Sequence, residues 1–182
     1  MTATADPDLA LRDAQKAIQA GDFAAAARIT GTVLAEDPTH KDALYMAAVC
    51  ARYEGRSADA LAHLATLKTA SPDFGRAYQE EGHLKRKLGD MSGAIGAYER
   101  ETRYNQALIA SWSALGDLYR QAGNEDAASN ARAQAERVRA LPRDLQAVTN
   151  HIHEGRVFRA EEIARAFLQR HPTHVEGMRL LA

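Results

Sequence analysis

Glycine recurs along this chain at an almost constant spacing, and this period constrains the fold more than any other feature. Successive members of the series are 34, 34, 34 and 32 residues apart: Gly21, Gly55, Gly89, Gly123 and Gly155. An alanine stands five residues after each glycine, and a small or medium-sized residue stands seven residues before each. A fixed period of this length is the signature of a repeat architecture, in which similar units stack on one another.

Each period is predicted to form two helices. In the segment "SWSALGDLYRQAG", Trp112, Leu115 and Tyr119 follow the spacing of one apolar helix face. Glycine then ends the first helix in the left-handed conformation, which it adopts without steric cost. The residue after the glycine can cap the second helix in three units, through Asp22, Asp90 and Asn124. A proline ends the second helix in three units, at Pro38, Pro72 and Pro172.

A 34-residue helix pair with these small, glycine, alanine and proline positions, and "SWSALGDLY" in its best copy, resembles the tetratricopeptide repeat. The resemblance implies an all-α fold, a right-handed superhelical solenoid of antiparallel helix pairs whose first helices line a concave groove. We predict a disordered N-terminus over residues 1–6 and a single array over residues 7–182. It would hold about five full repeats plus the start of a sixth, beginning near residues 7, 41, 75, 109, 141 and 175.

Two units depart from the repeat pattern. The third has Lys85 and Glu101 at positions that are mostly apolar in the other units, and Gln106 in place of the proline. The fourth has Arg132 and no closing proline, and the fifth unit then begins two residues early. We therefore predict a local change of superhelical pitch near Leu141.

Charge and composition exclude several functional classes. The 23 basic and 24 acidic residues nearly cancel, which argues against bulk electrostatic binding to nucleic acid or to a membrane surface. Arginine greatly outnumbers lysine, as is compatible with a bacterial source. Cys50 is the only cysteine, so no intrachain disulfide forms, and its apolar neighbours predict a core residue. The longest apolar run has nine residues, and the N-terminus lacks a signal-peptide pattern, so we expect a cytoplasmic protein.

No catalytic constellation is present in the sequence. His151 and His153 are two residues apart on a predicted helix and point to different faces, and His171 and His174 flank a Pro–Thr turn. None of these pairs has the spacing and additional ligands of a zinc site. The glycines of "GDMSGAIGAY" lack a preceding strand and do not form a nucleotide-binding loop. We therefore expect no enzymatic activity, no metal and no cofactor.

Three functional classes remain open: an interaction module, a non-catalytic region of a larger enzyme, and a purely structural array. For the second, the last 30 residues or so generally resemble repeats that precede a sulfotransferase domain in bacterial proteins, without any catalytic loop. Val175, Met178 and Leu181 begin an apolar stripe that the sequence does not continue. We therefore expect a piece of a longer array, with self-association through an open C-terminal end.

The candidate binding residues lie on the first helices, on the face that lines the groove in the repeat family. Three arginines occupy the position three residues before the glycine: Arg52, Arg86 and Arg120. Four further side chains lie beside them: Lys87, His83, Tyr45 and Tyr53. The family's Lys/Asn/Arg clamp on a terminal carboxylate is not matched. The hypothesis is therefore a protein partner that presents an extended, acidic segment to an arginine ladder; the alternative is that each arginine complements its own helix C-terminus.

Overall fold

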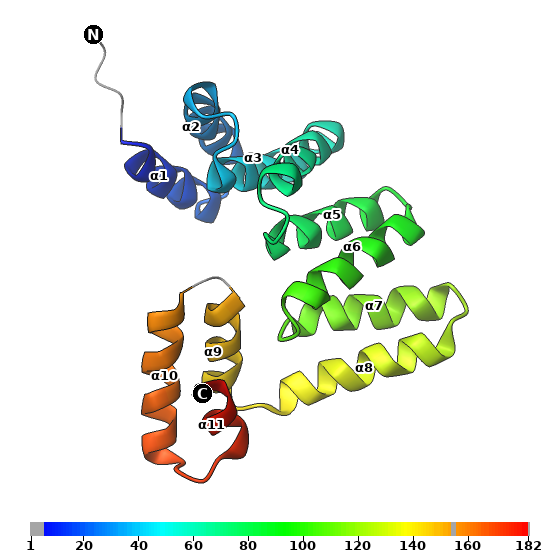
Figure 1. Cartoon of the computed structure of the whole chain (residues 1–182). Helices are drawn as coiled ribbons and strands as arrows, with labels where there is room; N and C mark the ends of the chain where they lie inside the picture. Colours follow the sequence, from blue (N-terminus) through cyan, green and yellow to red (C-terminus); the bar gives the residue numbers. More distant parts are fainter. Residues whose placement is uncertain (1–5, 154–155, 182) are drawn as a thin grey trace. The chain divides into compact units, whose positions relative to one another are not determined.

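A computed structural model describes residues 6–153 and 156–181, and in this part of the chain every regular element is a helix (Figure 1). The all-α fold predicted from the period is therefore confirmed. The helices are α1 (Pro7–Gln19), α2 (Phe23–Glu36), α3 (Lys41–Tyr53), α4 (Ser57–Ala70), α5 (Gly75–Lys87), α6 (Met91–Tyr104), α7 (Ile109–Gln121), α8 (Glu125–Ala140), α9 (Arg143–His153), α10 (Val157–Arg170) and α11 (Val175–Leu181).

The chain forms two compact units, unit 1 over residues 1–97 and unit 2 over residues 98–182. The boundary between them falls inside α6. The single array over residues 7–182 and the change of pitch near Leu141 stay predictions. Residues 1–5 of the N-terminus that we expect to be disordered lie outside the described residues, whereas Asp6 caps α1 by accepting the N–H of Asp8 (3.1 Å).

The glycine turns have the backbone conformation that the sequence predicts. Gly21, Gly55, Gly89 and Gly123 have φ between +78° and +79°, and Gly155 lies outside the described residues. The predicted caps also form: the side-chain oxygens of Asp22, Asp90 and Asn124 accept the N–H three residues later at 2.9, 2.9 and 3.1 Å. Glycine and its following cap together explain why one helix ends and the next begins within three residues.

Histidine caps two other helices, at the ends of the similar segments "DPTH" (residues 37–40) and "HPTH" (residues 171–174). Nδ1 of His40 accepts the N–H of Ala43 (3.4 Å) at the start of α3, and Nδ1 of His174 accepts the N–H of Gly177 (3.2 Å) at the start of α11. The two segments are therefore the same connection, used before two first helices.

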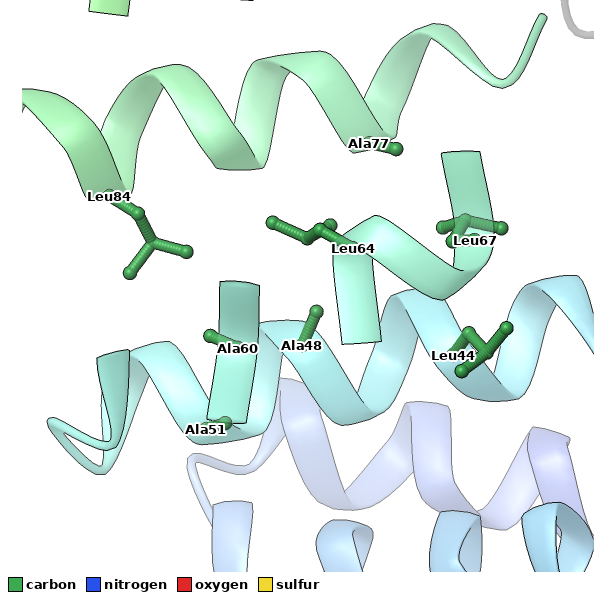
Figure 2. Close-up of a cluster of buried hydrophobic side chains, with 8 residues drawn as sticks. All are labelled: Leu44, Ala48, Ala51, Ala60, Leu64, Leu67, Ala77 and Leu84. Atoms are coloured by element: carbon green, nitrogen blue, oxygen red, sulfur yellow. The ribbon is translucent and has the colours of Figure 1, made fainter. Parts of the chain in front are cut away.

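The core of unit 1 is built from leucine and alanine on three consecutive helices, as Figure 2 shows. Leu64 and Leu67 of α4 and Leu84 of α5 are fully buried. The small residues at the repeat positions, Ala48 and Ala60, lie in the same cluster and are also buried, so the helices can approach closely. Each leucine buried in this way contributes about 1.5–3 kcal/mol to folding.

The helix pair α7–α8 of unit 2 accommodates the large side chain of Arg132 because Gly116 faces it. A Cβ atom on Gly116 of α7 would lie 3.0 Å from Cγ of Arg132 on α8. The aliphatic part of the Arg132 side chain therefore packs over the glycine, which explains how the fourth repeat tolerates an arginine in its second helix. A second cluster, formed by Val148, Ala160 and Ala164, joins α9 to α10 and α11.

The third repeat, which also departs from the repeat pattern, is accommodated by local contacts. Lys85 extends over Gly93, whose Cβ atom, if present, would lie 2.7 Å from Cδ of the lysine. At the end of α6, where the third repeat has no proline, hydrogen bonds of Asn105 stabilise the turn. Its Oδ1 accepts the N–H of Ala107 (2.9 Å), and its Nδ2 donates to Oδ1 of Asn150 (3.0 Å) on α9.

The last described helix, α11, leaves part of its apolar stripe exposed. Val175 is 74% exposed and Met178 is 45% exposed, beside a shallow groove lined by Leu168 and Pro172. Gly177, which stands between Val175 and Met178 in the sequence, lets α11 approach the side chains of Phe167 and Leu168. Self-association through this end stays a prediction.

Candidate interaction surface

The candidate residues lie on the first helices of three repeats: α3 and α5 in unit 1, and α7 in unit 2. Within unit 1, α3 packs against α1 on one side and α5 on the other. Tyr45, Arg52 and Tyr53 belong to α3, and His83, Arg86 and Lys87 belong to α5, so these six residues share one pair of neighbouring helices. Arg120 belongs to α7 in unit 2, where Nη2 forms an exposed ion pair with Oδ1 of Asp117 (3.0 Å) on its own helix. The ladder of three arginines therefore stays a proposal.

Arg52 is engaged inside the protein. Its Nε donates to Oε2 of Glu80 on α5 at 2.5 Å, and the two side chains are only 20% and 8% exposed. Burial opposes the charged guanidinium, but the nearby Glu80 carboxylate outweighs this effect and raises the pKa of Arg52 above its ordinary value. The pair therefore ties α3 to α5, and Arg52 is not a free anion-binding group.

The same arginine organises an aromatic stack. The Cζ atom of Arg52 lies 4.3 Å from the ring centroid of Tyr53, and this ring stacks on Phe23 of α2 with centroids 4.3 Å apart and planes inclined by 5°. Tyr53 nevertheless remains 57% exposed. A stacked, oriented and accessible aromatic ring is suited to contact an apolar side chain of a partner with little loss of conformational entropy.

Tyr45 lies at the other end of α3. Its ring meets Phe74 edge to face at 5.6 Å, and the Cζ atom of Arg76 lies 6.0 Å from its centroid. Tyr45 is half-buried, so its main contribution is to the packing between α3 and the start of α5.

His83 is half-buried within electrostatic reach of Glu80 and of two arginines. Burial lowers the pKa of His83 below its ordinary value of 6.5; Glu80 opposes this shift, and Arg52 and Arg86 add to it. The imidazole is therefore mainly neutral at neutral pH.

Arg86 and Lys87 differ from Arg52 because both are exposed. Among the residues that the structure describes, neither side chain forms an ion pair or a hydrogen bond. Both lie in the last turn of α5, where a positive charge also complements the helix dipole. They are the groups of this surface that can bind an external carboxylate.

Two important residues of this surface, Glu80 and Phe23, were missed by sequence reasoning. Glu80 stands nine residues before Gly89, a position that holds Arg12, Met46, Ala114 and Gln146 in the other repeats. The position is therefore not consistently apolar, and the only signal for the pair is that an acidic residue stands there in the repeat that follows Arg52. Phe23 follows a capping aspartate directly, and nothing in its own segment indicates which ring it contacts.

The rest of the described chain offers no other obvious chemical centre. No group of three or more potential metal ligands occurs in residues 6–153 and 156–181. Within the same residues, no helix combines the length and apolarity needed to cross a membrane. Cys50 is fully buried, and burial together with nearby Glu54 raises the pKa of its thiol to about 11, as expected for a core residue.

Comparison with known proteins supports the architecture. Residues 17–88 match the tetratricopeptide repeat family. The fold is similar to a crystal structure of MamA, which is 20% identical, with 90% of each chain covered and a TM-score of 0.66. A second MamA structure is 21% identical over 87% of this chain and 94% of MamA, with a TM-score of 0.63.

A further similar structure is TTC0263, a thermophilic tetratricopeptide-repeat protein of Thermus thermophilus. It is 20% identical over 96% of this chain and 97% of its own, with a TM-score of 0.62. No curated protein matches the sequence. Residues 17–88 thus carry the tetratricopeptide-repeat signature, and the described chain has the all-helical fold of tetratricopeptide-repeat proteins.

Proposed function

We propose that this protein is a non-catalytic, cytoplasmic scaffold that binds an extended segment of a protein partner on the α3–α5 face of unit 1. The observation that carries the proposal is the pair of exposed cations Arg86 and Lys87, which have no counter-ion among the described residues. They stand on α5, the helix that the Arg52–Glu80 pair ties to α3 and its exposed Tyr53 ring. Cations beside an oriented aromatic ring favour a ligand with carboxylates and apolar side chains. The tetratricopeptide fold supplies the rigid face on which these groups stand.

The three arginines have different roles in this proposal. Arg86, with Lys87, attracts the acidic segment, whereas Arg52 holds Tyr53 and the α3–α5 packing in place. Arg120, on α7 of unit 2, offers a separate contact for an acidic side chain, and its partner Asp117 would be displaced there. His83 and Tyr45 contribute shape at the same face of unit 1.

The test uses an array of synthetic peptides with graded aspartate and glutamate content. The purified chain should bind best to peptides that are both acidic and apolar. Replacing Arg86 and Lys87 together by glutamine should weaken this binding roughly five- to thirtyfold, the effect of two exposed charge pairs, and high salt should weaken it in the same way.

Two arginines on different helices of unit 2 provide a control with the same change of charge. Replacing Arg139 and Arg159 by glutamine removes the same charge from exposed ion pairs far along the sequence. Equal losses in the two variants, or binding that ignores peptide charge, would contradict the proposal.

The alternative is that the chain is the recognition or oligomerisation region of a larger enzyme, such as a sulfotransferase with tetratricopeptide repeats. Only the general sequence resemblance near the C-terminus favours it. Proteins with this chain fused to a catalytic segment would be needed to support that alternative.

A further inference from the structure

Exposed apolar side chains in the described part of unit 1 gather at the turns between first and second helices. Tyr53 precedes the turn at Gly55, and Leu88 (56% exposed) and Met91 (36% exposed) flank the turn at Gly89. The other large apolar side chain that is exposed in this unit is Leu9 of α1. Single exposed apolar residues are ordinary, whereas neighbouring ones can mark an interaction site, so the candidate is the pair Leu88 and Met91 that flanks one turn.

Leu88 is not required by the fold of the turn. The residue directly before the glycine is Ala20 in the first unit, Glu54 in the second and Ala122 in the fourth. The turn therefore forms equally well with a small or a charged residue at this position. Leu88 is the C-cap of α5 with φ −82° and ψ −2°, in the right-handed region, and the conformation of the turn is provided by Gly89 at φ +78°.

The charge next to this apolar pair is positive. Lys85 is compensated, because its Nζ lies 3.3 Å from Oε1 of Glu81 and 4.0 Å from Oδ2 of Asp90. Arg86 and Lys87 have no such partner among the described residues. At the preceding turn the charge is instead balanced, since Arg56 pairs with both Glu54 and Asp59. Two cations without a counter-ion among the described residues thus stand next to Leu88 and Met91 in the sequence.

We propose that Arg86, Lys87, Leu88 and Met91 form one binding site, the turn-edge site, for an acidic protein segment that carries large apolar side chains. This inference rests on the proposed function and adds the apolar anchor residues, Leu88 and Met91. The carboxylates of the segment pair with Arg86 and Lys87, and its apolar side chains cover Leu88 and Met91. In an extended segment, side chains on one face recur about every 7 Å, so acidic and apolar groups reach neighbouring parts of the site.

A second copy of the chain is a poor occupant for the same site. A twofold contact brings the same surface of both copies together, and Arg86 and Lys87 of one copy would then face those of the other. Like charges that face each other across an interface oppose association. The positive charge therefore favours a separate, acidic partner.

The methionines of the chain provide a direct test. Met91 lies in the turn-edge site, Met46 packs against the core of unit 1, and Met178 is exposed on α11 of unit 2. With isotope-labelled methionine methyl groups, the NMR signal of each can be followed while a short peptide of repeating Asp-Asp-Leu-Leu order is added, in which each face of the extended segment carries aspartate and leucine in turn. The Met91→Leu variant assigns the reporting signal.

The Met91 signal should shift and saturate with the aspartate–leucine peptide, while the Met46 and Met178 signals stay in place. A peptide with serine instead of leucine, and one with lysine instead of aspartate, should each bind at least about tenfold more weakly. Replacing Leu88 and Met91 together by serine should weaken binding about tenfold. Phe158→Ser, which removes a 91% exposed side chain from unit 2, should leave it unchanged.

The alternative outcomes separate the two proposals. If Arg86 and Lys87 matter for binding but the Met91 signal stays in place and the serine variant binds normally, the turn-edge site is wrong and the proposed function stands. If no peptide of the series binds, both fail. A Met91 signal that shifts only with protein concentration, or only with vesicles of anionic phospholipid, would assign the site to a second copy or to a membrane and would overturn the inference.

Discussion

Arg52 and Glu80 show how one residue pair can serve both stability and a binding surface. Their side chains are largely withdrawn from water, so each needs the other as a counter-ion. The pair also fixes the guanidinium over Tyr53, whose ring stays accessible. The contact joins residues 28 positions apart, on the first helices of two successive repeats.

Removing the charge of Glu80 should therefore destabilise the protein. We expect Glu80→Gln to lower the free energy of unfolding by about 2–3 kcal/mol, because the largely buried Arg52 loses its counter-ion. Urea unfolding measures the effect. The exposed pair of Arg120 and Asp117 provides the control, and Asp117→Asn should change stability by no more than about 0.5 kcal/mol. Similar effects at the two sites would show that burial does not strengthen the Arg52–Glu80 pair.

His83 should make the stability of the protein depend on mildly acidic pH. Burial lowers the pKa of His83 in the folded state, so the unfolded chain binds this proton more readily. Above pH 6.5, the ordinary pKa, His83 does not make the free energy of unfolding depend on pH. As pH falls below 6.5, the unfolded chain takes up the proton first, so the folded state loses stability. His83→Gln should lose less stability than the wild type between about pH 7 and about pH 5.5 in thermal unfolding. Identical losses would exclude His83 as a source of the acid sensitivity.

At the scale of single helices, glycine has two opposite roles in this chain. In the turns its positive φ is needed, whereas inside a helix a glycine without close neighbours adds only backbone freedom. Gly96 of α6 has no heavy atom within 4 Å of the position of an added Cβ. At Gly93, one turn earlier, an added Cβ would lie 2.1 Å from Oδ2 of Asp90, the residue that caps α6.

Three alanine substitutions should therefore have three different effects. Gly96→Ala should stabilise the protein by about 0.5–1 kcal/mol, since it removes backbone freedom from the unfolded chain. Gly55→Ala should destabilise it by about 1–2 kcal/mol, because φ is +79° there. Gly93→Ala should fail to give the gain of Gly96→Ala, because the capping aspartate has to move. Urea midpoints of the three variants measured side by side would test this order, and a gain at Gly55 would contradict it.

At the scale of the whole molecule, the sequence predicts local structure well because each signal acts within one repeat. The glycine turns and aspartate caps require only neighbouring residues, so Gly21 and Asp22 were assigned correctly from their spacing alone. The burial of Cys50 followed from its apolar neighbours. These features together determine the helix pairs and the fold class.

The contacts of the candidate surface were much harder to predict. The sequence places Arg52 in a row of similar arginines, but it does not reveal that Glu80 on the next first helix neutralises it. The stack of Phe23 on Tyr53 depends on the angle between two helix pairs. Such contacts are decided by side-chain geometry between repeats, and the period of the sequence contains no information on that geometry.

The single buried thiol of Cys50 allows local unfolding of unit 1 to be measured by chemical labelling. Because this thiol is fully enclosed in α3 and its pKa is about 11, a thiol-specific dye meets almost no reactive thiolate at neutral pH while the helix is packed. Labelling then proceeds only as fast as α3 separates from its neighbours, and no competing cysteine obscures the signal. The rate of dye incorporation thus reports, for every variant described above, how often the middle of unit 1 exposes its interior.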